Sequence, residues 1–310
     1  MKIAFLFPGQ GSQYVGMAKE FIENFAESRN AFSAASNRLG YDLADLCVNG
    51  PAEKLNLTEN TQPAILTTSI AILRVLERKG LTAGAAAGHS LGEYTAITAA
   101  GGFSLEDAAG LVQKRGRYMQ EAVPAGVGLM AAILGMDRAA VERTCLEASK
   151  NGIVAPANYN SPGQIVIAGE KKAVETAMEL AKTGGAKKVV PLAVSVPSHC
   201  PMMKQAGERL AQELDAVTIS DLRFPIVNNA DAKLLRTAAE LKPSLIRQIS
   251  SSLYWEDSIN VLTSEGFDSF IEIGPGKVLS GLVKRIAKDA KVLNVEDLKS
   301  MNETLAALGA

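Results

Sequence analysis

The chain has 310 residues, of which 47% are hydrophobic and 21% charged, so it is long enough to bury a large core. Its net charge of −1 excludes the strongly basic surface that nucleic acids or anionic membranes attract. The three cysteines are widely spaced and there are only two histidines, which argues against a disulfide framework and a Cys/His metal cluster. We therefore expect a reducing, cytoplasmic compartment.

The first element is predicted to be a buried strand at residues 3–7, a continuous apolar run. This apolar run follows Lys2, as the apolar region of a secretion signal follows a basic residue. Pro8 and Gly9 end the run after five residues, which is too short for such a signal. No stretch reaches the roughly 18 apolar residues of a membrane span. The glycine-rich loop 8–13 lacks the spacing of a dinucleotide or P-loop motif. It either binds phosphate or supplies a backbone donor or the Gln10 amide to a site.

The central motif is Gly-His-Ser-Leu-Gly at residues 88–92, which has the G-x-S-x-G pattern of a nucleophile elbow. We expect a helix over 64–79, a strand over 82–87 and a second helix over 93–100 that stops at Gly101 and Gly102. The flanking glycines allow a tight strand-to-helix turn that exposes the hydroxyl of Ser90 and aims backbone N–H groups at an oxyanion.

The next helix is predicted to begin after Ser104, a good N-cap with Asp107 three residues later. Its apolar stripe contains Leu111 and Met119, and Arg115 lies on the same face. A guanidinium is costly there unless it is paired. Arg115 either extends to solvent or pairs with a buried carboxylate, or it binds a substrate anion, for which a carboxylate suits its planar fork.

Residues 126–194 have the order strand, helix, strand, strand, helix, strand of a ferredoxin-like unit. The strands are expected at 128–134, 153–159, 164–168 and 188–194, and the helices at 137–149 and 171–183. We interpret this unit as an insertion whose edge overhangs the elbow. The fold class is then α/β, with an α/β-hydrolase-like parallel-sheet core formed by residues 1–125 and 195–310.

The remainder of the chain returns to the larger domain. Prolines on both sides of His199 indicate a stiff loop, followed by a helix. A strand is expected at 224–228, then a helix that holds Gln248 and has Trp255 near its end. A strand at 269–273 runs into the turn 274–277, which is structural or, through its lysine, binds phosphate. A strand at 292–295 and a helix after 296 close the chain.

Serine is a poor nucleophile until a base takes its proton. The side chain of His89 is expected to point away from the adjacent Ser90, so His199 is the candidate base. A hydrolase would place an acid between Ser90 and His199, but Asp107 and Asp137 both have the positions of helix-start residues. A glutamate remains open, and a Ser–His dyad oriented by a main-chain carbonyl is the simpler interpretation.

These motifs together resemble the malonyl-CoA:acyl carrier protein transacylase family. The matching segments run in order from residue 5 to about 285 and lie at 7–13, 88–94, 113–116, 160–164, 197–199 and 272–277. The resemblance implies ping-pong transfer of a malonyl group from malonyl-CoA to the phosphopantetheine thiol of acyl carrier protein. It also implies that the malonyl-carrier product supplies fatty acid synthesis and that the transfer needs no metal or redox cofactor.

The resemblance also implies residue roles. Ser90 attacks the thioester, and His199 is the base and then the acid. The backbone N–H groups of Gln10 and Leu91 form the oxyanion hole, and Arg115 binds the malonyl carboxylate.

By the same resemblance, the main-chain carbonyl of Gln248 orients the imidazole, and His89 supports the elbow. The carrier proteins of this pathway are typically acidic. Candidate contacts with the carrier are Lys187, Lys188, Lys284, Arg285 and Lys288. The alternative is that these residues form an ordinary solvated basic face with no partner.

Three alternatives remain open from the sequence. A serine esterase or thioesterase would share Ser90 and His199, and Arg115 distinguishes it. A transferase of methylmalonyl or other branched units is compatible with the small Ser198. A non-enzymatic binding module would have no use for the elbow. We expect a monomer that binds neither nucleic acid nor membrane.

Overall fold

The computed structural model describes residues 1–124, 126–192 and 196–309, and its larger part is built on a six-stranded sheet. The strand order is β11 (Lys291–Val295), β10 (Ser269–Ile273), β1 (Ile3–Phe7), β2 (Ala85–Gly88), β7 (Ile226–Val227) and β8 (Leu234–Leu235). The first five strands are parallel, and β8 is antiparallel to β7. The predicted α/β class is confirmed.

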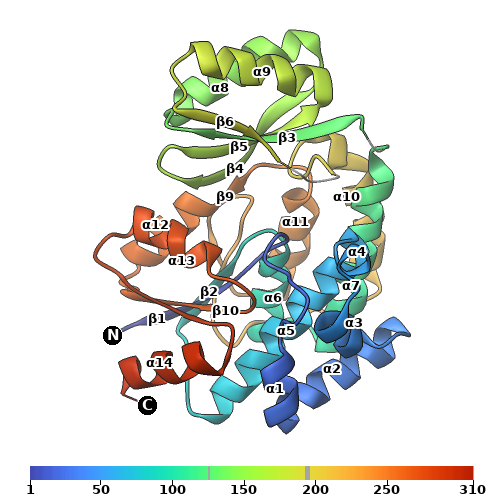
Figure 1. Ribbon diagram of the computed structural model, residues 1–310, viewed down its shortest axis with the longest axis vertical. Helices are drawn as coiled ribbons and strands as arrows, with labels where there is room; N and C mark the ends of the chain where they lie inside the picture. The colour runs from blue at the N-terminus through green and yellow to red at the C-terminus, as the bar shows by residue number, and fades with distance from the viewer. Residues whose placement is uncertain (125, 193–195, 310) are drawn as a thin grey trace.

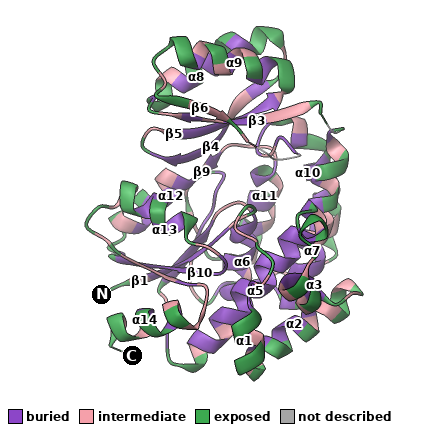
Figure 2. Ribbon diagram, viewed as in Figure 1, coloured by how far each residue is buried: buried purple, intermediate pink, exposed green. Residues whose placement is uncertain are grey.

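Helices cover both faces of this sheet, because its central strands bury both sets of alternating side chains (Figures 1 and 2). Phe5 and Phe7 of β1 face a large core with α5 (Thr58–Arg78), α6 (Leu91–Ala99) and α7 (Leu105–Ala122). Ala4 and Leu6 face a smaller core with α12 (Trp255–Ser264) and α13 (Val278–Ile286).

The remaining helices of the larger part surround these cores. They are α1 (Lys19–Asn24), α2 (Ala26–Leu39), α3 (Leu43–Asn49), α4 (Ala52–Leu55), α10 (Lys204–Asp215), α11 (Ala238–Gln248) and α14 (Leu298–Leu308). A 3-10 turn at Pro201–Met203 precedes α10. No helix in the described ranges is both long and apolar enough to span a membrane.

A second sheet lies above the carboxyl end of the first (Figure 1). Its strand order is β6 (Lys188–Pro191), β3 (Gly128–Leu134), β5 (Gln164–Glu170), β4 (Val154–Ser161) and β9 (Leu253–Tyr254). The first four are antiparallel and, with α8 (Arg138–Ala148) and α9 (Lys171–Thr183), form the expected ferredoxin-like unit. A 3-10 turn at Ser149–Asn151 follows α8. The added β9 belongs to the returning chain and pairs in parallel with β4.

Several boundaries differ from the sequence expectations. Helix α5 begins at Thr58 and contains Pro63, because burial along most of its length offsets the one hydrogen bond that proline removes. Trp255 starts α12 and does not end the preceding helix, since β9 intervenes. The expected strand 188–194 is described to Pro191, and residues 193–195 and 125, where the predicted domain boundaries fall, lie outside the described residues.

Candidate active site

Ser90 stands between β2 and α6 in a strained backbone conformation, with φ 54° and ψ −104°. The flanking Gly88 and Gly92 must be glycines because neighbouring backbone atoms lie where a Cβ atom would be. A Cβ on Gly88 would lie 1.8 Å from the carbonyl oxygen of Gly92, and a Cβ on Gly92 would lie 2.1 Å from that of Phe7. The turn is therefore packed against both itself and β1, which places the hydroxyl at the carboxyl end of the sheet.

His199 faces the Ser90 hydroxyl from the loop before α10. Its Nε2 lies 2.7 Å from Ser90 Oγ, and its Nδ1 lies 2.9 Å from the main-chain oxygen of Gln248. A carbonyl oxygen only accepts, so Nδ1 carries the proton and Nε2 is free to accept one from the serine. Burial and then the charge of Arg115 lower the pKa of His199 to about 3, so the imidazole is neutral at pH 7.

The other histidine is engaged elsewhere. His89 Nε2 lies 2.9 Å from Asn160 Oδ1 on β4, and its ring meets the edge of Trp255 at 5.6 Å between centroids. A Cβ on Gly9 would lie 2.5 Å from the His89 carbonyl oxygen, so the loop after β1 is packed tightly onto the elbow. His89 thus joins the elbow to the second sheet and does not contact the nucleophile as a base.

Arg115 is 1% exposed and points from α7 into the site. One Nη donates to Gln62 Oε1 at 2.8 Å, and the other donates to Gln248 Oε1 at 3.0 Å and to Ser90 Oγ at 3.2 Å. Within the described parts of the chain no carboxylate forms a salt bridge with it, and its Nε has no hydrogen-bond partner. A buried cation without a counter-ion, beside a nucleophile, is suited to an anionic substrate.

Two backbone donors line the same cavity. The N–H groups of Gln10 and Leu91 have no hydrogen-bond acceptor among the residues described, whereas the N–H of Ser90 donates to Asn229 Oδ1 at 2.8 Å. The Gln10 side chain instead donates to Thr58 Oγ1 at 3.3 Å. Free N–H groups on both sides of a nucleophilic serine are what an oxyanion hole requires.

The cavity that contains these groups has a volume of about 210 Å³ and is lined by both parts of the molecule. The second sheet contributes Met130, Asn158, Asn160 and Val166. A second hollow of about 230 Å³ adjoins it, sharing Gln10, His89 and Asn160, and extends toward α13. The cavity at Ser90 is therefore bordered by a second hollow that leads away from the serine.

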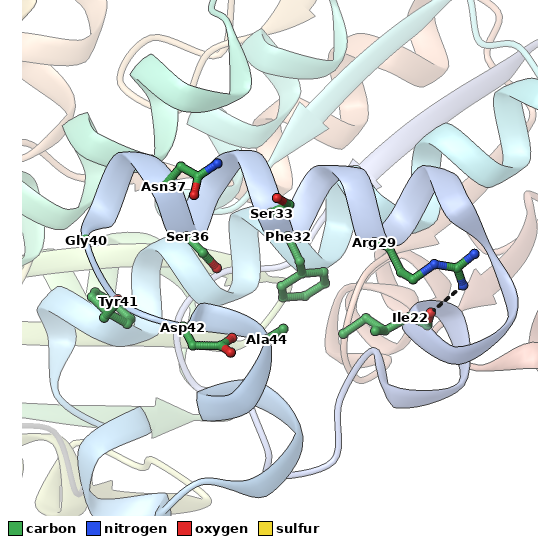
Figure 3. A pocket seen from close by; sticks show the side chains of 10 residues that line it. All are labelled: Ile22, Arg29, Phe32, Ser33, Ser36, Asn37, Gly40, Tyr41, Asp42 and Ala44. Atoms are coloured by element: carbon green, nitrogen blue, oxygen red, sulfur yellow. Dashed lines mark hydrogen bonds between the residues drawn. The ribbon is translucent and has the colours of Figure 1, made fainter.

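A larger hollow of about 610 Å³ lies far from this chemistry, between α2 and the start of α3 (Figure 3). Its arginine, Arg29, donates to the carbonyl oxygen of Ile22 at 2.9 Å, and Asp42 caps α3. The charged groups here thus serve helix ends, and the lining residues include neither a histidine nor a cysteine. Cavity size alone would therefore select the wrong site.

The phosphate interpretations of the two glycine-rich turns are not supported. At the start of α13 the N–H groups of Leu279 and Ser280 donate to the Glu272 carboxylate, which occupies the place of an anion. The loop after β1 uses its groups internally, through Ser12 Oγ to the Gly9 carbonyl oxygen and the Gly11 N–H to Gln13 Oε1. Its position beside Ser90 fits the alternative, a supplier of a backbone donor.

Sequence reasoning missed several residues that complete the site. Gln62 holds Arg115, and Asn229 Nδ2 donates to the Gly88 carbonyl oxygen at 2.8 Å. The Gln248 side chain also contacts Arg115 and the Ser90 carbonyl oxygen, beyond the expected role of its main chain. Asn229 follows β7, and the carboxyl ends of parallel strands commonly carry site residues, so its place was a usable signal.

Comparison with known proteins agrees with this geometry. Residues 4–302 match the family model described as acyl transferase domain. The chain is 49% identical over 308 residues to a malonyl CoA-acyl carrier protein transacylase of Bacillus subtilis (strain 168), covering 99% of this chain and 97% of that protein. A crystal structure of the transacylase of that name from Clostridium perfringens superposes with a TM-score of 0.97 at 46% identity, covering 100% of this chain and 98% of that one.

A third match is a malonyl-transacylase in complex with a holo acyl-carrier protein of a type II PKS, with a TM-score of 0.96 and 45% identity. It covers 99% of this chain and 100% of that one. Both the sequence likeness and the structural likeness extend over nearly the whole length. The chain therefore belongs to the acyl transferase family.

Proposed function

We propose that this chain transfers a malonyl group from malonyl-CoA, through an acyl-Ser90 intermediate, to the phosphopantetheine thiol of acyl carrier protein. The observation that carries the proposal is the buried Arg115 guanidinium, which has no carboxylate partner among the described residues and lies 3.2 Å from Ser90 Oγ. Malonyl-CoA presents a free carboxylate a short distance from its thioester carbonyl. The names of the relatives favour a transacylase over an esterase or thioesterase.

In the first half-reaction Ser90 Oγ attacks the thioester carbonyl while its proton moves to His199 Nε2. The N–H groups of Gln10 and Leu91 donate to the oxyanion of the tetrahedral intermediate. The C–S bond then breaks, and the imidazolium gives its proton to the departing CoA sulfur. Arg115 exchanges its hydrogen bond to Ser90 Oγ for one to the malonyl carboxylate, because the ester oxygen is a weaker acceptor.

The second half-reaction reverses these roles with a different thiol. His199 removes the proton of the phosphopantetheine thiol, the sulfur attacks the acyl-serine carbonyl, and the C–O bond to Ser90 breaks. The proton on His199 returns to Ser90 Oγ. The exchange of one thioester for another is redox-neutral and uses only the side chains of the chain itself, so we propose that it needs no cofactor.

The properties of the base His199 explain why the acyl-Ser90 intermediate reacts with a thiol in preference to water. Within the described ranges no carboxylate contacts His199, whose Nδ1 faces the neutral carbonyl of Gln248, and burial lowers its pKa. Such a base is poorly matched to water, whereas a thiol is far more acidic and needs less assistance. We expect purified protein to release malonate from malonyl-CoA much more slowly than it malonylates the carrier; equal rates would contradict this explanation.

The decisive experiment is mass spectrometry of the intact protein after mixing with malonyl-CoA. We expect one malonyl adduct on Ser90 that disappears when holo acyl carrier protein is added, with malonyl-carrier formed in its place. The Ser90→Ala variant should form no adduct. An adduct that persists with the carrier present, or that forms on another residue, would refute the proposal.

We further propose a docking surface for the carrier beside the second hollow. Arg285 on α13 donates to Gln164 Oε1 at 2.6 Å, and Lys187 lies against Gly135, whose N–H donates to the Gly163 carbonyl oxygen. A cation from α13 and a cation that precedes β6 thus both lie near the β4–β5 turn. The other exposed candidates are Lys188, Lys284 and Lys288, and none of the five forms a salt bridge within the described ranges.

This docking surface predicts a selective kinetic effect. Reversing the charge of Lys284 and Arg285 to glutamate should raise the KM for an acidic carrier and leave the rate of Ser90 malonylation by malonyl-CoA within about twofold of wild type.

We also propose that the protein acts as a monomer, since one chain supplies every group of the site. Its three free, buried cysteines suit the cytoplasm.

A further inference from the structure

Glu93 is a fully buried carboxyl that the reaction described above does not use. It lies on α6 one turn after Ser90, with 0% of its surface exposed. Its Oε2 accepts from the Asn229 N–H at 2.9 Å and from Gln248 Nε2 at 3.0 Å, while its Oε1 has no partner among the residues described. A carboxyl that is desolvated without a salt bridge costs stability, so its presence calls for an explanation.

The carboxyl is one of the groups that set the orientation of the Gln248 amide. In the observed orientation Nε2 donates to the Ser90 carbonyl oxygen at 2.8 Å and to Glu93, and Oε1 accepts from Arg115 at 3.0 Å. Nε2 also lies 3.4 Å from Asn229 Oδ1, so a flipped amide would set its NH2 against the guanidinium, a donor against donors, and its oxygen against three acceptors. Every contact therefore favours one orientation, and Glu93 provides the only carboxylate that contacts this amide within the described chain.

We propose that Glu93 is a positioning residue, which fixes the Gln248 amide so that its oxygen aims the Arg115 guanidinium at the malonyl carboxylate. The inference rests on the proposed function, because it concerns the selectivity of the same site. Glu93 touches neither substrate nor the reacting atoms. Its effect reaches the site through Gln248, whose main-chain oxygen also holds His199.

Removing the acceptor should lower selectivity more than it lowers basal acylation. In Glu93→Ala the amide loses one of its fixed partners and rotates more freely, so Arg115 is less well placed. We expect the ratio of malonyl to acetyl acylation rates to fall about tenfold or more. In Glu93→Gln the amide oxygen still accepts from Asn229 and Gln248, and the ratio should stay within about threefold of wild type.

A double-mutant cycle tests the route through Gln248. Gln248→Leu keeps the main-chain oxygen and removes the amide, so it should lower the ratio as Glu93→Ala does. The combined variant should fall no further than Gln248→Leu alone. Additive losses would mean that Glu93 acts by another path and would overturn the inference.

Glu272 provides a matched control, since it is also a buried carboxyl that accepts backbone N–H groups, at the start of α13 away from Ser90. Glu272→Ala should lower the melting temperature and leave the malonyl-to-acetyl ratio unchanged. If Glu93→Ala likewise lowers only the melting temperature, its role is structural and the inference fails.

The assay is single-turnover acylation by malonyl-CoA and acetyl-CoA, followed by mass of the intact protein. Should Glu93→Ala not fold, Glu93→Asp replaces it, because the shorter side chain withdraws the carboxyl from Gln248 and should lower the ratio while Glu93→Gln preserves it. The inference is overturned if the malonyl-to-acetyl ratio of Glu93→Asp equals that of wild type. It is also overturned if Glu93→Asp and Glu93→Gln lower this ratio equally. Failure of the wild type to form the malonyl adduct would instead refute the proposed function.

Discussion

Replacing Arg115 by alanine tests the substrate assignment most directly. In the structure the guanidinium donates hydrogen bonds to Gln62, Gln248 and Ser90 Oγ. The N–H group that donates to Ser90 becomes available once the serine is acylated. The Nε–H, which has no partner among the described residues, is another available donor. If the malonyl carboxylate takes two charge-assisted hydrogen bonds of about 1.5–3 kcal/mol each, the variant loses about 3–6 kcal/mol of transition-state stabilisation.

That loss corresponds to a decrease of about 10²- to 10⁴-fold in kcat/KM for malonyl-CoA. Acetyl-CoA has no carboxylate, so its acylation rate should hold or rise when the buried cation is removed. Both rates can be measured as CoA release coupled to acyl-enzyme formation. Arg117 on the same helix is a matched control, since it is half-exposed and paired with Glu59, and Arg117→Ala should leave both rates unchanged. An equal loss on malonyl and acetyl substrates would refute the carboxylate assignment.

Two further predictions follow from the structure. The pKa of His199 is lowered from 6.5 to about 3, so its basic form persists on acidification and the malonylation rate should stay level between about pH 8 and about pH 5. Burial raises the pKa of Glu93 to about 7, so the profile is recorded in Glu93→Gln as well; a fall near pH 6.5 in that variant would contradict the prediction. Gly88→Ala should prevent folding, because its Cβ would overlap backbone, whereas Gly281→Ala, with nothing within 4 Å of its Cβ, should stabilise helix α13 by about 0.5–1 kcal/mol in thermal unfolding.

Elements with strong local patterns could be predicted residue by residue. The strand expected from the apolar run 3–7 and the helix expected at 171–183 have the bounds that the structure shows, Ile3–Phe7 and Lys171–Thr183. Strand β9 could not be predicted, because it is two residues long and exists only through its pairing with the distant β4. Local sequence carries no information about such a partner.

The candidate site divides in the same way. The motif placed Ser90, and a guanidinium on an apolar stripe singled out Arg115, since both signals are local. Gln62 was missed because an amide side chain is ordinary at a surface and becomes informative only when tertiary packing buries it, whereas Asn229 had a usable signal in its place after an expected strand. The role of the Gln248 carbonyl came from family resemblance, because any residue has a main-chain oxygen and its type gives no signal.

The short segment from Gln248 to Trp255 explains why the site depends on the ferredoxin-like unit. Gln248 ends α11 with its oxygen on His199, Leu253 and Tyr254 then pair with β4, and Trp255 begins α12 against His89.

The joint between the two sheets is reinforced at the side chains. The Tyr159 and Tyr254 rings stack at 5.1 Å, and the Arg138 guanidinium lies 4.0 Å from the Tyr159 ring while pairing with Asp257 at 2.5 Å. Without β4, β9 would lose its pairing with the second sheet, and the segment that holds the imidazole would keep only the Tyr254 N–H bond to the Asn229 carbonyl oxygen at 2.9 Å among the backbone bonds of β9 in the described chain. The inserted unit therefore does more than line the cavity: it fixes the acceptor that keeps His199 in the tautomer able to deprotonate Ser90.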